Sequence, residues 1–287
     1  MKIRTYLEFV KFEHTVFALP FAYLGAVLAK EGIPSPSEWF WITMAMVGAR
    51  TAGMGLNRII DRDLDAVNPR TQIRPLQTKR MTLAEARRLV EMALVVFVLS
   101  AVMLKPICLL LLPLAGALLF LYSYVKRFSW ATHFVLGMVL ACAPIGGWVA
   151  IQGRLALVPV LLGLSVFCWV AGFDIIYSCQ DYEVDRRHGI HSLPANVGIA
   201  KALLVSRLLH LTSLFLIAGV GVSARLGSLF WFGLLGAGIF LIWEHRLVHP
   251  EDLSRVNQAF FVMNGLVSLV LFATVFLERW LRVVKGS

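Results

Sequence analysis

Charged side chains are scarce in this sequence: Asp, Glu, Lys and Arg make up 15% of the 287 residues, whereas 59% are hydrophobic. A soluble domain of this length has too little interior for so much apolar side chain, so the composition excludes an ordinary soluble fold. The four cysteines form no CxxC pair, and all lie in or beside apolar runs. A zinc or redox motif of that type is therefore absent. Nor does the sequence contain a Ser/His/Asp or Cys/His arrangement for nucleophilic catalysis.

Acidic residues are also fewer than basic ones, 17 against 27. The basic residues cluster between long apolar runs, as loops do at a membrane surface, so we expect a lipid bilayer and no nucleic acid as partner. Nineteen of them fall on the N-terminus and the even-numbered connections, and seven on the odd-numbered connections and the C-terminal tail. This asymmetry predicts a cytoplasmic N-terminus and an external C-terminus. We expect the membrane to be the bacterial cytoplasmic (inner) membrane.

Nine apolar segments follow one another, each near the roughly 20 residues that a spanning helix needs. We therefore expect an all-α integral membrane protein of nine transmembrane helices around a central cavity. Residues 1–287 would form one domain, with two four-helix halves (approximately 12–126 and 132–245) and a ninth helix. The predicted segments are Phe12–Ala29, Glu38–Leu56, Leu89–Leu104, Ile107–Tyr124, Thr132–Ile151, Val158–Ile176, Ala202–Val222, Leu226–Trp243 and Gln258–Leu277.

The stretch NRIIDRDLDAVNPRTQIRP follows directly on the second apolar segment. Its residues Asn57, Asp61 and Asp65 are spaced i, i+4, i+8, so on a continuing helix they lie on one face, at an exposed helix end. Two carboxylates and an amide oxygen, with no positive charge on that face, suit Mg²⁺. Arg70 and Arg74 follow, and their guanidinium groups suit phosphate oxygens. The stretch is therefore predicted to bind a diphosphate together with Mg²⁺.

The same spacing recurs 120 residues later in Tyr177, Asp181 and Asp185, again after an apolar segment. Two basic residues, Arg186 and Arg187, again follow. Two acidic stretches at the ends of two apolar helices, in matching parts of the chain, indicate two faces of one site.

Two ionisable residues lie inside apolar segments, where they are costly and imply a partner or a polar cavity. Arg50 precedes Asn57 by seven residues, and Asp174 precedes Asp181 by seven. Either they pair with each other across the bundle, or they line the polar floor of a substrate cavity. In the second case Arg50 is placed to meet an anionic aromatic acceptor.

Three further positions allow two interpretations each. Lys126, four residues after Tyr122 in LYSYVKR, either extends to lipid headgroups or adds a cation to the diphosphate, with Tyr122 on the same face. Asn257 and Asn264, in the last apolar segment, either hold helices together or line the cavity.

These motifs resemble those of the UbiA superfamily of intramembrane prenyltransferases. NRIIDRDLD is similar to its first acidic motif, NxxxDxxxD, and GFDIIYSCQDYEVDRRHGIHS to its second. LYSYVKR resembles the Tyr/Lys pair of its fourth helix, and NPRTQIRPL a stretch found in members acting on aromatic acids. Within the superfamily the chain looks closest to 4-hydroxybenzoate polyprenyltransferases. KFEHTVFALP, however, stands where many of these have an Arg-x-x-Lys-Pro-like stretch.

The resemblance implies a nine-helix fold that transfers a prenyl group from a polyprenyl diphosphate to an aromatic acid in quinone biosynthesis, with Mg²⁺ as cofactor. The implied metal ligands are Asn57, Asp61 and Asp65 for one ion and Asp181 and Asp185 for a second. The implied substrate-binding residues are Arg50, Arg70, Arg74, Tyr122, Lys126, Asp174 and Tyr177. The alternatives are prenylation of a dihydroxynaphthoate in menaquinone biosynthesis, a secondary transporter, and a non-enzymatic lipid-binding or scaffold protein.

Overall fold

The computed structural model describes residues 2–11, 15–30 and 32–286, and within them the chain forms helices joined by turns, with no strand of a sheet. Phe12, the predicted start of the first apolar segment, lies outside the described residues. The helices are α1 (Lys2–Phe9), α2 (Thr15–Ala29), α3 (Pro36–Ile60), α4 (Arg62–Val67), α5 (Leu83–Met103), α6 (Pro106–Val125), α7 (Thr132–Gln152), α8 (Leu157–Ser178), α9 (Tyr182–His188), α10 (Leu193–Val197), α11 (Ile199–Ser223), α12 (Ser228–Leu247), α13 (Val256–Gln258) and α14 (Asn264–Gly286).

Among the described residues, six helices are long and apolar enough to cross a membrane. They are α6, α7, α8 with its continuation to His188, α11, α12 and the composite helix from Val256 to Lys285. Helix α2 is apolar but has 15 residues, and α3 and α5 are long enough but are less apolar or more charged than these six. The prediction of an all-α integral membrane protein is confirmed, whereas the count of nine spans stays a prediction.

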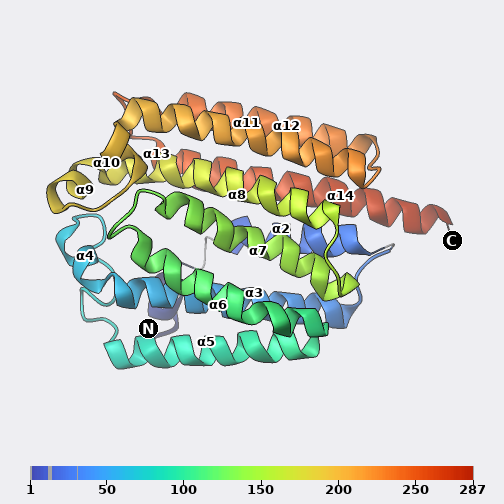
Figure 1. The fold of residues 1–287 in the computed structure, drawn as a ribbon, viewed down its shortest axis with the longest axis horizontal. Helices are drawn as coiled ribbons and strands as arrows, with labels where there is room; N and C mark the ends of the chain where they lie inside the picture. Colours follow the sequence, from blue (N-terminus) through green and yellow to red (C-terminus); the bar gives the residue numbers. More distant parts are fainter. Residues whose placement is uncertain (1, 12–14, 31, 287) are drawn as a thin grey trace.

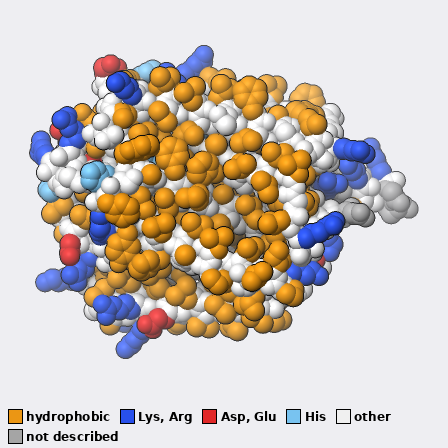
Figure 2. Space-filling view, in the orientation of Figure 1, with side chains coloured by type: hydrophobic (Ala, Val, Ile, Leu, Met, Phe, Trp, Pro, Cys, Tyr) orange, Lys and Arg blue, Asp and Glu red, His pale blue; other side chains and the backbone are white. Residues whose placement is uncertain are grey.

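The short helices lie together at one end of the bundle. Figure 1 shows α4, α9 and α10 at this end, while the C-terminal part of α14 projects at the opposite end. Hydrophobic side chains cover the face between the two ends in Figure 2, and Lys and Arg side chains gather towards both ends. An apolar belt between two charged ends is the surface that a bilayer requires.

Helix α3, which carries the first acidic stretch, begins at a capping box. The Ser35 hydroxyl accepts a hydrogen bond from the Glu38 N–H at 3.3 Å, and the Glu38 carboxylate accepts one from the Ser35 N–H at 2.6 Å. Pro36 occupies the first helical position, where a missing N–H costs nothing. This cap fixes where the helix begins, at the end of the bundle opposite the acidic stretch.

Helices α2 and α7 cross at direct backbone contact. A Cβ added to Gly25 would overlap the Pro144 carbonyl, and one added to Gly147 would overlap the Ala22 carbonyl. Small residues allow this approach, which supplies packing where lipid removes the hydrophobic driving force between helices. The crossing holds α7 beside α2.

Helix α8 forms the centre of the second group of helices, and its Trp169 is fully buried among α2, α11, α12 and α14. The Trp169 indole N–H donates to the Asn264 side-chain oxygen at 2.7 Å, and the Asn264 amide donates to the buried Glu244 carboxylate at 2.7 Å. Asn264 therefore holds α8, α12 and α14 together. Asn257 is exposed.

We expect Asn264→Ala to destabilise the protein by about 2–4 kcal/mol, because it leaves the Trp169 N–H and the Glu244 carboxylate buried without their partner. Thermal unfolding in detergent measures the change. Asn257→Ala removes the same side chain from an exposed position and serves as the matched control. Equal melting temperatures for the two variants would contradict this role of Asn264.

Candidate active site

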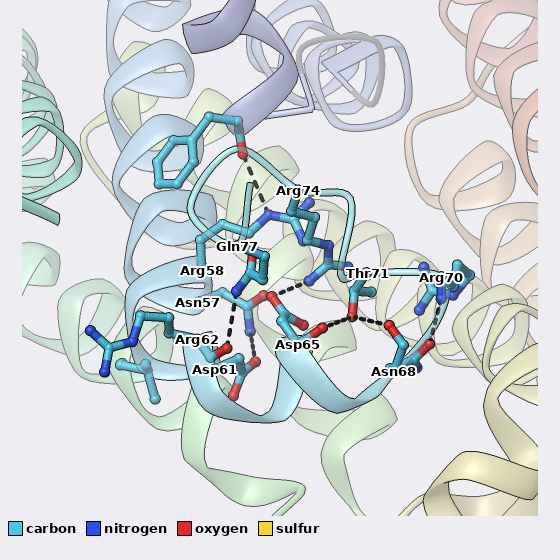
Figure 3. Close-up of polar contacts among 12 residues, drawn as sticks. Asn57, Arg58, Asp61, Arg62, Asp65, Asn68, Arg70, Thr71, Arg74 and Gln77 are labelled. Atoms are coloured by element: carbon cyan, nitrogen blue, oxygen red, sulfur yellow. Dashed lines mark hydrogen bonds and ion pairs between the residues drawn. The ribbon is translucent and has the colours of Figure 1, made fainter. Parts of the chain in front are cut away.

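The first acidic stretch follows a nearly helical path with a break at Asp61. Helix α3 ends at Ile60 and α4 begins at Arg62, so the predicted continuous helix is interrupted at one residue, where φ is −87° and ψ is 7°. The Asp61 N–H still donates to the Asn57 carbonyl, and the Asp65 N–H to the Asp61 carbonyl, each at 2.8 Å. The Asn57 amide donates to the Asp61 carboxylate at 2.7 Å (Figure 3).

The second acidic stretch breaks at the equivalent residue. Helix α8 ends at Ser178, a 3-10 turn covers Cys179–Asp181, and α9 starts at Tyr182. Asp181 has φ −96° and ψ 3°, close to the values at Asp61. The 120-residue repeat in the sequence is thus a repeat in backbone conformation as well. Arg186 and Arg187, which follow, are both exposed.

Positive charges reach the carboxylates, so the prediction of a carboxylate face without them is wrong. Lys126 Nζ lies 2.5 Å from one oxygen of Asp61, and Arg127 Nη1 lies 3.0 Å from the other. Arg74 pairs with Asp65 (Figure 3). The predicted exposed position is also wrong, because the Asp61 side chain is 0% exposed and that of Asp65 7%. The sequence did not reveal the two pairs of Asp61 because Lys126 and Arg127, which directly follow α6, are more than 60 residues away in the chain.

The loop after the first stretch extends to the second. Arg70 donates two hydrogen bonds to the Asp181 carboxylate, from Nε at 3.0 Å and from Nη2 at 2.5 Å. It also donates to the Tyr177 hydroxyl at 3.2 Å, and Asn68 donates to Asp181 at 2.8 Å. Burial alone would lower the pKa of the Arg70 guanidinium, but the bonds to Asp181 outweigh it and raise that pKa. Arg70 is therefore a permanent cation that joins the two acidic stretches.

A cavity of about 700 Å³ lies behind these ion pairs. Every candidate residue except Asp61 lines it; Asp61 lies behind Lys126, Arg127 and Asn57. The lining candidates are Arg50, Asn57, Asp65, Arg70, Arg74, Tyr122, Lys126, Asp174, Tyr177, Asp181 and Asp185. The remaining lining is mostly apolar, so the cavity has one charged end and a long apolar interior.

Arg50 and Asp174 do not pair within the part of the chain that the structure describes, which decides between the two alternatives. Asp174 accepts a hydrogen bond from His133 Nδ1 at 2.7 Å, whereas Arg50 donates to the Lys11 carbonyl at 3.4 Å. His133 Nε2 accepts from the Leu193 N–H at 3.2 Å, so the proton of the neutral ring is on Nδ1. Arg50 and Asp174 are thus separate polar groups on the cavity wall.

Sequence reasoning missed three contributors to the site: Asn68, Arg127 and His133. Asn68 is the first residue of NPRTQIRP, two residues before Arg70, and Arg127 directly follows Lys126, so a wider reading of either stretch would have included them. His133 begins a long apolar run, and a lone buried histidine there is as typical of packing as of function. Only its contact with Asp174, 41 residues away, shows that it belongs here.

Comparison with known proteins supports the interpretation of the motifs. The model of the UbiA prenyltransferase family matches residues 18–266, most of the chain. The chain belongs to this family. As a UbiA-family enzyme it is similar to a 4-hydroxybenzoate octaprenyltransferase from Chromohalobacter salexigens, with 33% identity over 254 residues, covering 88% of this chain and 84% of the relative. Family membership excludes the transporter and the non-enzymatic scaffold.

Two solved UbiA homologues share the fold. The structure of the homologue from Aeropyrum pernix K1 is 35% identical, with a TM-score of 0.84, and the match covers 93% of this chain and 98% of that one. A homologue from Archaeoglobus fulgidus was solved bound to GPP and Mg²⁺; it is 18% identical, with a TM-score of 0.75 and coverage of 94% and 99%. The second likeness shows the fold alone.

The donor atoms at the charged end of the cavity fit one kind of Mg²⁺ site. In the described part of this UbiA-family chain, no group of three His, Cys, Asp or Glu side chains is arranged to hold a metal ion. Mg²⁺, however, is usually held by one or two carboxylates together with substrate phosphates, and the available donors are carboxylate and amide oxygens. The residues therefore fit a metal that is completed by a diphosphate, not an all-protein metal cage.

Proposed function

We propose that this enzyme transfers a polyprenyl group from a polyprenyl diphosphate to an aromatic acid such as 4-hydroxybenzoate, with Mg²⁺, for quinone biosynthesis. One observation carries the proposal: the carboxylates of two acidic stretches form four ion pairs with Arg and Lys side chains at the charged end of an otherwise apolar cavity. Carboxylates suit the metal, the cations suit phosphate oxygens, and the apolar interior suits a prenyl chain. The names of the curated relatives point to the same substrates.

The charged end binds the diphosphate in this mechanism. Asn57, Asp61 and Asp65 would hold one Mg²⁺, and Asp181 and Asp185 a second. The metal supplies positive charge to the leaving group when it is bound. Arg70, Arg74 and Lys126 exchange their carboxylate partners for phosphate oxygens and stabilise the negative charge that develops there.

The transfer itself is an electrophilic substitution on the acceptor ring. The allylic C–O bond breaks, the electron pair leaves with the diphosphate, and an allylic cation remains in the apolar cavity, which keeps water away. A ring carbon of the acceptor forms the new C–C bond with this cation. The ring then loses a proton, and Asp174, a carboxylate on the cavity wall that is held by His133, is placed to accept it. Tyr122 and Tyr177 also line the cavity.

The charged end faces the cytoplasm in this proposal, in a single domain of nine spans in the bacterial inner membrane. The asymmetry of the basic residues supports it, because both acidic stretches belong to the basic, even-numbered connections. A reporter fused to the C-terminus is therefore expected to behave as extracytoplasmic, and one inserted after Lys79 as cytoplasmic. A cytoplasmic signal at the C-terminus would mean an even number of spans.

The deciding assay uses purified protein in detergent with a long polyprenyl diphosphate. 4-Hydroxybenzoate and 1,4-dihydroxy-2-naphthoate are offered in parallel, and the products are identified by mass. We expect prenylated 4-hydroxybenzoate, loss of the product with EDTA, and recovery with added Mg²⁺. Product from the naphthoate alone would establish the menaquinone alternative. Absence of product from both acceptors would contradict transfer to these aromatic acids.

A further inference from the structure

A short segment, residues 190–197, follows the second acidic stretch and docks on its neighbours at the charged end of the cavity. It includes α10, which lies at the end of the bundle that carries α4 and α9 (Figure 1). The His191 N–H donates to the Lys126 carbonyl at 2.8 Å, and Ser192 forms a hydrogen bond with the Asp185 carboxylate. This docking segment is therefore placed by two residues to which the proposed function assigns the diphosphate and its metal.

The docking segment also contacts His133 of α7. The Leu193 N–H donates to His133 Nε2 at 3.2 Å, and His133 Nδ1 lies 2.7 Å from Asp174 Oδ2. The His133 side chain is 2% exposed, so solvent has little access to either bond. The imidazole thus joins the backbone of the docking segment to a carboxylate on the cavity wall.

One protonation state of His133 satisfies both contacts. The Leu193 N–H needs a lone pair on Nε2, and the Asp174 carboxylate needs an N–H on Nδ1. A doubly protonated ring, or the tautomer with its proton on Nε2, would set two donors against each other at Leu193. The contact with Leu193 therefore fixes the tautomer that donates to Asp174.

This state leaves one oxygen of Asp174 for chemistry. Oδ2 accepts from His133, and no second hydrogen bond to this carboxylate forms within the described ranges of the chain. The Asp174 side chain is 21% exposed and lines the cavity. Oδ1 can therefore accept a proton from a bound molecule, whereas His133 cannot, because both of its nitrogens are engaged.

We propose that His133 is a positioning residue that makes removal of the ring proton depend on the docking segment. The inference rests on the proposed function. In this step the C–H bond of the prenylated ring breaks, its electron pair restores the aromatic ring, and the proton forms an O–H bond with Asp174 Oδ1. The docking segment, which is held at the diphosphate end, thereby orients the group that completes the reaction at the acceptor.

Leu193→Pro tests the inference by removing the N–H that fixes the tautomer. Ser192 has φ −128° and ψ 160°, a conformation that a residue before proline adopts, and Leu193 is the first residue of α10, where proline is tolerated. Leu193→Ala is the matched control, because it removes the buried side chain but keeps the N–H. We expect kcat to fall about 100-fold in Leu193→Pro and less than about fivefold in Leu193→Ala.

A deuterated acceptor shows which step has become slow. 4-Hydroxybenzoate that carries deuterium at the ring positions next to the hydroxyl has to lose a deuteron, so slower transfer to Asp174 increases the isotope effect on kcat. We expect the isotope effect to rise about twofold or more over wild type in Leu193→Pro and in His133→Leu, and to stay at the wild-type value in Leu193→Ala. A loss of packing or of metal binding would slow turnover without this rise.

His133→Gln separates positioning from proton transfer through the imidazole. The amide offers one donor and one acceptor but does not titrate, so it can replace both contacts. We expect His133→Gln to keep more than about a tenth of wild-type kcat, and His133→Leu to keep about a hundredth.

Equal kcat values for His133→Gln and His133→Leu would overturn the inference, and so would an unchanged isotope effect in both Leu193→Pro and His133→Leu. Wild-type protein that forms no prenylated acceptor would instead reject the proposed function.

Discussion

Asp65→Asn is expected to lower kcat by about a thousandfold or more, the scale on which a preorganised electrostatic contact to developing charge contributes. Asparagine keeps the size of the side chain but loses the charge that holds a metal and pairs with Arg74. Asp61→Asn should have an effect of the same order, since Asp61 is the partner of both Lys126 and Arg127. The amide is preferable to alanine because both carboxylates are buried, and truncation would also disturb packing.

Asp63 provides the matched control within the same short helix. Its side chain is 88% exposed and, among the residues that the structure describes, pairs with the neighbouring Arg62 alone. Asp63→Asn should therefore change kcat by less than about twofold, as expected for an exposed ion pair. Steady-state kinetics at saturating substrates and Mg²⁺ compare the three variants. An Asp65→Asn enzyme that kept more than about a tenth of wild-type kcat would remove Asp65 from the metal ligands.

Arg50→Lys is expected to raise the KM for 4-hydroxybenzoate by about 10- to 100-fold and to leave the KM for the prenyl diphosphate unchanged. Arg50 precedes Asn57 by two helical turns, so it lies about 10 Å deeper than the first carboxylate-bearing turn. At that depth it lines the cavity below the diphosphate end, where an acceptor carboxylate can meet it. Lysine keeps the charge but loses the two-pronged hydrogen bond to a carboxylate.

The methyl ester of 4-hydroxybenzoate separates recognition of the carboxylate from a general disturbance of the cavity. If Arg50 binds the carboxylate, the wild-type enzyme should already use the ester poorly, and Arg50→Lys should add little further loss. A variant that weakened acid and ester by the same factor would show that Arg50 acts on the shape of the cavity. Arg62→Lys, an exposed change twelve residues further along the chain, should leave both acceptors unaffected.

The sequence predicted what depends on spacing along one helix. The interval of four residues between Asn57, Asp61 and Asp65 is enough to bring their side chains together, because residues four apart lie on the same face of a helix. Partners from different helices depend on rotation and depth within the bundle, which no local pattern encodes. The sequence therefore did not predict the ion pairs of Lys126 and Arg127 with Asp61. It also suggested Arg50 as the partner of Asp174, whereas Asp174 pairs with His133.

A wide turn interrupts the last long helix between α13 and α14. Ala259–Met263 is a π-helix, and the Asn264 amide donates to the Phe260 carbonyl at 3.1 Å. Such a turn amounts to one inserted residue, which rotates the preceding part of a helix by about 100° relative to the rest. Phe260, near the start of this turn, packs against Tyr177 at the site, and Asn264, which directly follows the turn, donates a hydrogen bond to Glu244.

The two contacts therefore require different rotations of the last helix about its axis, one before the turn and one after it. An unbroken α-helix that kept Asn264 on Glu244 would turn Phe260 away from Tyr177, and one that kept Phe260 in place would turn Asn264 towards another neighbour. Insertions and deletions of a single residue, tolerated in most loops, are thus excluded at this position. The length of the chain here, and not only its composition, is part of what this sequence specifies.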